Sequence, residues 1–193
     1  ALALAALNAA SASRTVKPEG DLAVVLRSAL RSDQADLSEQ ALGLIGRWRV
    51  SGLHGDVVAL VDNTRAAMPT RLAAVRALGL LGGDDAQRLA KLIDSGDATE
   101  ELKLAALDSL SRVDMSAAAS RGAALLALGQ ATTGVLSPFL NREGGGPALT
   151  AALARRKPGA APAAVALAKL QSLGSNETGL MNLLSQAAGI ENT

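Results

Sequence analysis

The sequence predicts an all-α solenoid of stacked antiparallel helix pairs, and three observations support this fold class. First, Ala-Leu-Gly-Leu-Ile-Gly at 41–46 returns as Ala-Leu-Gly-Leu-Leu-Gly at 77–82, and Val-Ala-Leu-Val-Asp at 58–62 returns in weaker form at 90–94. Second, repeats at offsets of 36 and 32 residues are typical of helix pairs that bury their apolar faces against neighbouring pairs. Third, the chain is 49% hydrophobic but 1% aromatic, so alanine and leucine, both strong helix formers, must fill its core. We expect about five or six pairs within the 193 residues.

The first half of the chain is divided into helices by its capping and breaking residues. Asp21 and Ser38 are expected to open helices, because short polar side chains satisfy the free amide groups of a first turn. Pro69 fits the first turn of a helix, where its missing N–H has no partner to lose. Gly82 then ends that helix in the left-handed conformation that glycine adopts readily. We expect helices over 2–12, 21–32, 38–50, 55–66 and 69–81.

The second half of the chain begins as regularly and ends less regularly. Asp84 and Asp85 are expected at a helix start, where negative charge faces the helix dipole favourably. Pro138 should kink or split the helix in which it lies, because proline cannot donate the hydrogen bond of a helix interior. We expect helices over 84–95, 98–112, 114–128, 131–142, 147–155, 162–173 and 177–188.

The composition argues against several classes of function. The chain has 19 basic and 18 acidic residues, without the basic excess and the aromatic side chains of a nucleic-acid-binding surface. It has no cysteine, and therefore no disulfide, thiolate metal site or thiol nucleophile. No run of 18 apolar residues is present to span a bilayer. The start at Ala1 is interpreted as the first helix of a fragment of a longer protein.

Four features suggest a chemical or binding role, and each also has a structural interpretation. The only histidine, His54, is interpreted as a helix-start or turn residue, because a metal site needs two or three converging ligands. The glycines at 144–146 are interpreted as a break between helices, since the lysine and hydroxyl residue of a phosphate-binding loop do not follow them. Trp48 is either a core residue between helices, which we favour, or an anchor at an interface. The run over 155–157, Arg-Arg-Lys, is either a solvated helix end or a site for an acidic partner.

Residues 69–92 resemble HEAT and HEAT-like repeats. In that family a proline and a basic residue open one helix, Ala-Leu-Gly closes it, and a leucine-rich second helix follows. The resemblance implies a HEAT-like α-solenoid that forms a single domain over 1–193, with regular repeats over about 38–129 and a less regular C-terminal helical cap over about 130–193. The residues that carry the resemblance are Pro69, Arg71, Ala74, Ala77, Leu78 and Gly79.

A narrower resemblance rests on the sequence over 41–50 and on Pro-Phe-Leu-Asn-Arg-Glu-Gly-Gly-Gly-Pro-Ala-Leu at 138–149. Both look like a HEAT-like segment of large secreted proteins of planctomycetes and their relatives. In those proteins the segment lies between a propeller similar to a sugar dehydrogenase and a C-terminal c-type cytochrome domain. This chain departs from them because it has no Cys-x-x-Cys-His haem-attachment site. The resemblance implies a periplasmic or extracellular location, while composition alone leaves the cytoplasm open.

These features predict a non-catalytic scaffold for protein–protein or interdomain interaction, and the resemblance implies a spacer between the catalytic and cytochrome domains of a larger protein. We expect no catalytic residue, cofactor, metal ligand or nucleic-acid partner. The alternative is an enzyme or ligand binder on the same scaffold, similar to bilin lyases or DNA-repair glycosylases, whose pockets need an acidic residue beside aromatic groups. At the 32-residue offset Asp62 is expected to stack over Asp94, and Asp56 over residue 88. The polar face expected to meet a partner consists of Asp56, Asp62, Arg65, Arg88, Lys91 and Asp94.

Overall fold

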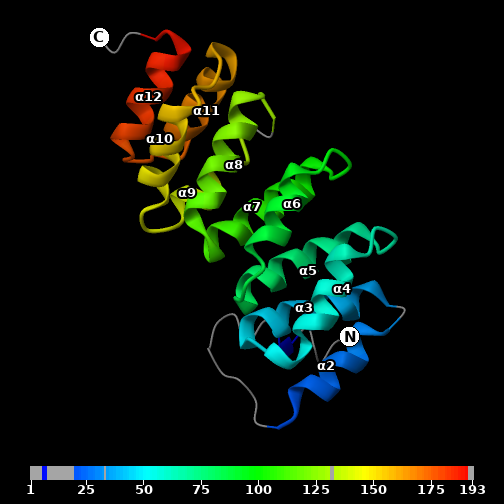
Figure 1. The fold of residues 1–193 in the computed structure, drawn as a ribbon. Coiled ribbons are helices and arrows are strands. Elements are labelled where there is room, and N and C mark those ends of the chain that lie inside the picture. The colour runs from blue at the N-terminus through cyan, green and yellow to red at the C-terminus, as the bar shows by residue number, and fades with distance from the viewer. Residues whose placement is uncertain (1–5, 8–19, 33, 131–132, 191–193) are drawn as a thin grey trace. The chain divides into compact units, whose positions relative to one another are not determined.

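The computed structural model describes residues 6–7, 20–32, 34–130 and 133–190, and over these ranges the chain forms helices and no strand (Figure 1). The all-α prediction is therefore confirmed for the described residues. The helix expected over 2–12 lies mostly outside them, although Ala6 and Leu7 are helical. The chain divides into two compact units, residues 1–85 and 86–193.

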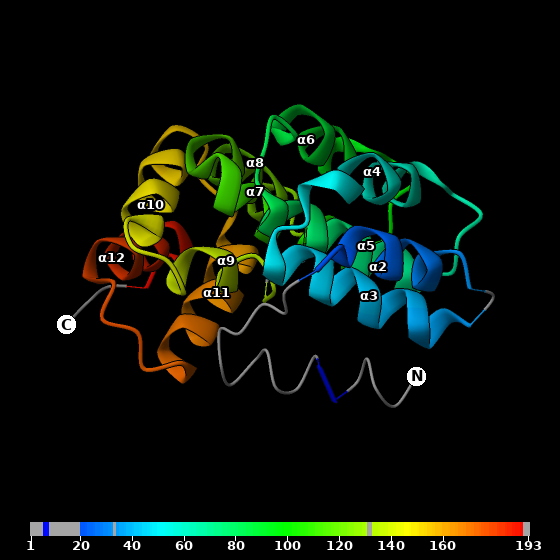
Figure 2. The ribbon, with the colours of Figure 1, turned by 90° about the horizontal axis from the view of Figure 1, so that it is seen from below.

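The first unit is built around two helices that pack against each other, α3 and α5. Helix α2 packs on α3, and α4 packs on α5 (Figures 1 and 2). A short 3₁₀ turn, η1, leads directly into α4. The elements are α2 (Leu22–Leu30), α3 (Ala35–Trp48), η1 (Ser51–Leu53), α4 (His54–Asp62) and α5 (Met68–Leu81).

Two of the predicted helix starts in this unit are confirmed and one is wrong. The Asp21 carboxylate accepts hydrogen bonds from the backbone N–H groups of residues 23 and 24 at 3.1 and 3.3 Å, as an N-cap should. Pro69 lies in the first turn of α5. Ser38, however, lies inside α3, which begins at Ala35. Its buried hydroxyl donates to the carbonyl oxygen of Leu30 at 3.3 Å, so it joins α3 to the end of α2 instead of capping α3.

Helix α4 ends earlier than predicted, which places Arg65 outside the helix. The chain leaves the helical conformation at Asn63, whose φ and ψ are −75° and 96°. The side-chain oxygen of Asn63 accepts a hydrogen bond from the N–H of Arg65 at 3.0 Å. Asparagine side chains compete with helical bonds in this way, so a local turn replaces the last predicted helical turn.

The end of α3 fixes Trp48 in the core. Arg49 adopts the left-handed conformation, with φ and ψ of 50° and 55°. Its N–H bonds to the carbonyl of Gly46 at 3.2 Å, and the N–H of Val50 bonds to that of Ile45 at 3.0 Å. This pair of bonds is a Schellman motif. Trp48 is 8% exposed, so the preferred interpretation of this residue as part of the core is confirmed.

The second unit contains seven helices over its described residues. Helix α7 packs on α6 and α8, α8 packs on α10, and α10 and α11 both pack on α12 (Figure 1). Of the helix predicted over 131–142, the described residues from 133 onward form only the four-residue helix α9, with Pro138 in its first turn. The elements are α6 (Ala86–Asp94), α7 (Glu100–Val113), α8 (Met115–Ala127), α9 (Ser137–Leu140), α10 (Gly145–Arg155), α11 (Ala160–Ser172) and α12 (Thr178–Ala188).

The sequence repeat corresponds to a repeated pattern of burial. Helices α3, α5 and α7 each contain 14 residues, and α4 and α6 each contain nine. Positions separated by the repeat offsets are buried alike, which shows that corresponding helices turn the same face inward. These buried sets are Leu42, Leu78 and Leu110; Ala41, Ala77 and Ser109; Val57 and Leu89; and Val61 and Ile93.

Candidate functional site

The part of the predicted partner surface that lies in the first unit is only partly available to a partner. The Asp56 carboxylate on α4 lies 3.3 Å from Nε of Arg27 on α2, and both side chains are about one-third exposed. Asp62 and Arg65 are exposed, at the end of α4 and in the turn that follows. Asp56 therefore links α2 to α4, and a partner could reach this part of the surface at the exposed residues Asp62 and Arg65.

The part of this surface in the second unit lies on α6. The carboxylate of Asp94 accepts from Nε and an Nη of Arg121 on α8, at 3.1 and 2.9 Å. Arg88 is half-buried, and Lys91 is exposed. Asp94 thus joins α6 to α8. The predicted stacking of Asp62 over Asp94 and of Asp56 over Arg88 stays a prediction.

Histidine and aspartate form a close pair that sequence reasoning did not anticipate. His54 begins α4, as the helix-start interpretation required. Its Nε2 lies 2.6 Å from Oδ2 of Asp85, whose side chain is 8% exposed. Asp85 was expected only at a helix start, but its buried carboxylate also holds the start of α4 against the segment that follows α5.

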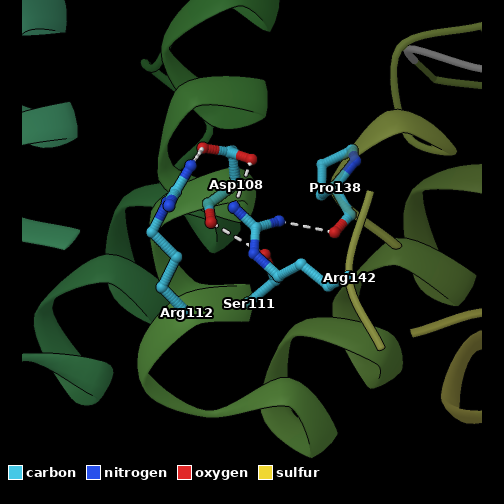
Figure 3. Close-up of polar contacts among 5 residues, drawn as sticks. All are labelled: Asp108, Ser111, Arg112, Pro138 and Arg142. Atoms are coloured by element: carbon cyan, nitrogen blue, oxygen red, sulfur yellow. Dashed lines mark hydrogen bonds and ion pairs between the residues drawn. The ribbon is translucent and has the colours of Figure 1, made fainter. Parts of the chain in front are cut away.

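A group of polar contacts, which we call the Arg142 cluster, joins α7 to the segment after α9 (Figure 3). It comprises Asp108, Ser111, Arg112, Pro138 and Arg142. An Nη of Arg142 lies 2.9 Å from Oδ1 of Asp108, while Arg112 lies 3.4 Å from Oδ2. The second Nη of Arg142 donates to the carbonyl of Pro138. Both oxygens of one carboxylate are thus held by guanidinium groups, so the cluster is a cross-link between helices.

The glycines beside this cluster are places of close approach. Gly144 caps α10 with a φ of 73°. A Cβ on Gly145 would lie 2.8 Å from Cα of Phe139 and still closer to its carbonyl. A Cβ on Gly146 would lie 2.6 Å from Oε1 of Glu177. An anion therefore already occupies the space beside Gly146, which disfavours a phosphate and agrees with the predicted helix break.

Sequence reasoning missed four long-range pairs of acidic and basic side chains among the described residues, although a signal for them was present. The pairs Arg27–Asp56, His54–Asp85, Asp94–Arg121 and Asp108–Arg142 join residues 29, 31, 27 and 34 positions apart. These separations lie close to the repeat offsets, so opposite charges about one repeat apart were the available signal.

Two further observations concern the described residues only. They contain no group of three or more histidine, aspartate or glutamate side chains placed to hold a metal ion. None of their helices has the length and apolar character that crossing a membrane requires.

None of the family models, curated proteins or solved structures compared with the chain matches it.

Proposed function

We propose that this chain is a non-catalytic helical scaffold for protein–protein or interdomain interaction, whose helix pairs stack as a HEAT-like α-solenoid of about five or six pairs. The sequence repeat and the matching buried positions support stacking, because each helix of a pair buries the same face as its counterpart one repeat away. The proposal includes the single-domain organisation and the C-terminal cap inferred from the sequence.

The observation that carries the proposal is that many charged side chains bind other parts of the chain and link its helices. Four acidic side chains each contact an arginine or histidine side chain about one repeat away along the chain. A further carboxylate, that of Asp114, caps α8 by accepting from the N–H of Ala117 at 2.9 Å. The long-range contacts link elements that are not adjacent in the sequence, α2 to α4 and α6 to α8 among them, and such links favour a fixed arrangement of helices, which a spacer or binding platform needs.

The cellular context is proposed from the resemblance over 41–50 and 138–149. In that context the chain holds a catalytic domain and an electron-accepting cytochrome domain at a fixed separation within a periplasmic or extracellular protein. The Arg142 cluster and the glycines beside it give the second of these segments a structural role, as a rigid corner between α7 and α10.

The first test is the intact mass and the visible absorption spectrum of the native full-length gene product. A product much larger than this chain with a c-type haem band would support the spacer role. A haem-free product close to the size of this chain would overturn the context and leave a free-standing scaffold.

The second test addresses the partner surface in the same full-length product. We expect Arg65→Glu combined with Lys91→Glu to change the pattern of cross-links to neighbouring domains or partners, since both side chains are exposed. Arg76→Glu, also exposed but outside the predicted surface, is the control. An unchanged pattern in the double variant would rule out this surface.

A further inference from the structure

Three consecutive cations form the strongest uncompensated charge on the second unit. Arg155, Arg156 and Lys157, which we call the basic turn, lie at the end of α10 and directly after it, and all three are exposed. None of their side chains makes an ion pair within 4 Å or a hydrogen bond with the described residues. By contrast, Arg121 and Arg142 of the same unit are both bound to carboxylates.

The surroundings of the basic turn contain almost no negative charge. The five helices from α8 to α12 include no aspartate or glutamate. Between residues 145 and 188 the only acidic residue is Glu177. Its carboxylate lies beside Gly146, at the opposite end of α10 from Arg155, which an 11-residue helix places roughly 15 Å away. The positive potential of the turn is therefore not neutralised by its own helices.

The basic turn is held in place by the backbone on both sides. The N–H of Arg156 donates to the carbonyl of Ala152 at 3.1 Å, which closes α10. Pro158, directly after the three cations, is buried, and α11 begins at Ala160. A short anchored turn loses little conformational freedom on binding, so it presents its cations more favourably than a loose tail would.

The favourable position of cations at a helix end accounts for only part of this cluster. Arg155 lies in the last turn of α10, where a cation interacts well with the helix dipole. Arg156 and Lys157 lie beyond the last helical residue and gain less from that effect, since it falls off within the last turn.

The composition of the chain selects among anionic partners. Single-stranded nucleic acid is bound by cations together with exposed aromatic rings, whereas Trp48 and Phe139, the only aromatic residues, are both buried. Anionic membranes are usually recognised by clusters of about four to eight cations, more than this turn supplies. An acidic protein segment needs only a few cations on a fixed surface.

We infer that the basic turn is a docking site for an acidic segment of a protein partner or neighbouring domain. The inference rests on the proposed scaffold function and specifies the chemistry of one of its partners. It assigns binding to the turn after α10, a different segment from the residues of α4 and α6 that the sequence predicted.

The test measures fluorescence anisotropy of a labelled oligoglutamate peptide of about ten residues with the whole chain at low salt. The test variant carries Arg155→Glu, Arg156→Glu and Lys157→Glu. The matched control carries Arg31→Glu, Arg49→Glu and Arg76→Glu, three exposed sites outside both the basic turn and the predicted partner surface, so both variants have the same net charge. Far-UV circular dichroism melts show that each variant is folded. Oligothymidylate and phosphatidylserine vesicles are the comparison ligands.

We expect the chain to bind the glutamate peptide, with affinity that falls as salt rises. The basic-turn variant should bind about tenfold more weakly or worse, because three exposed ion pairs are lost and repulsions replace them, while the control binds within about threefold of the original chain. Absence of peptide binding, equal weakening in both variants, or tighter binding of the thymidylate or the vesicles would each overturn the inference. Such a result would leave the scaffold proposal to the haem and cross-linking tests, which do not depend on this turn.

Discussion

Removing Arg142 should destabilise the second unit far more than removing Arg112, although both side chains bind the same carboxylate. The Arg142 side chain is 16% exposed, and it bonds Asp108 and the carbonyl of Pro138. The Arg112 side chain is 42% exposed, and it meets Asp108 at 3.4 Å within the same helix. The comparison separates a cross-link between distant segments from a surface ion pair.

The expected cost of Arg142→Ala follows from the two bonds that it breaks. A hydrogen bond that involves a charged group contributes about 1.5–3 kcal/mol, so two such bonds set an upper limit near 6 kcal/mol. The Asp108 side chain is 38% exposed and keeps Arg112 as a partner, so solvent and the second cation make up part of the loss. We expect a net loss of about 2–3 kcal/mol in the free energy of unfolding for Arg142→Ala. For Arg112→Ala we expect about 0.5 kcal/mol or less, as for other exposed pairs one helical turn apart.

The assay is urea unfolding of the whole chain, followed by far-UV circular dichroism, with both alanine variants measured beside the original sequence. A smaller midpoint with an unchanged slope reports a loss of stability. Equal destabilisation by the two substitutions, or a loss below about 1 kcal/mol for Arg142→Ala, would refute the assignment of Arg142 as the cross-link.

Three further substitutions test the packing directly. Gly122→Ala should lower the free energy of unfolding by about 1–3 kcal/mol, because the new Cβ would lie 2.9 Å from the buried Phe139 ring. Gly55→Ala, within α4 and with open space around it, should raise the free energy of unfolding by about 0.5–1 kcal/mol. The melting temperatures of the two variants should therefore shift in opposite directions. Arg49→Gly should raise stability by up to about 1 kcal/mol, since it relieves a left-handed non-glycine residue, and an unchanged or lower urea midpoint would contradict this. Leu78→Asp buries a charge at a 0% exposed position in α5 and should unfold the first unit, so a melting curve like that of the original sequence would argue against the α5 assignment.

Helix limits could be predicted wherever a local signal determines them. Asp21, Pro69 and Asp114 act within one turn of their own position, and all three begin helices as expected. Ser38 was misplaced because its hydroxyl meets a carbonyl of another helix, a contact that the local sequence does not contain. Arg65 was misplaced because the Asn63 side chain bonds to the backbone and ends α4 early.

The candidate site was less predictable, because ion pairs depend on how helices pack. Asp56 and Asp94 were expected to face a partner, yet each binds an arginine about one repeat away along the chain. The repeat itself indicated which separations to examine, but it could not show which of the available charges would meet. Gly145 and Gly146 illustrate the same limit, since their sequence showed only a break, and the packed neighbours Phe139 and Glu177 supply the reason for glycine.

The burial of Trp48 has a practical consequence for following the folding of this chain. Trp48 is the only tryptophan, and it belongs to the first of the two compact units. With no tyrosine present, tryptophan fluorescence reports on the unit formed by residues 1–85 alone, while circular dichroism reports on every helix. Recording both signals in one denaturant titration would show, without any added label, whether the two units unfold as a single cooperative body or in separate steps.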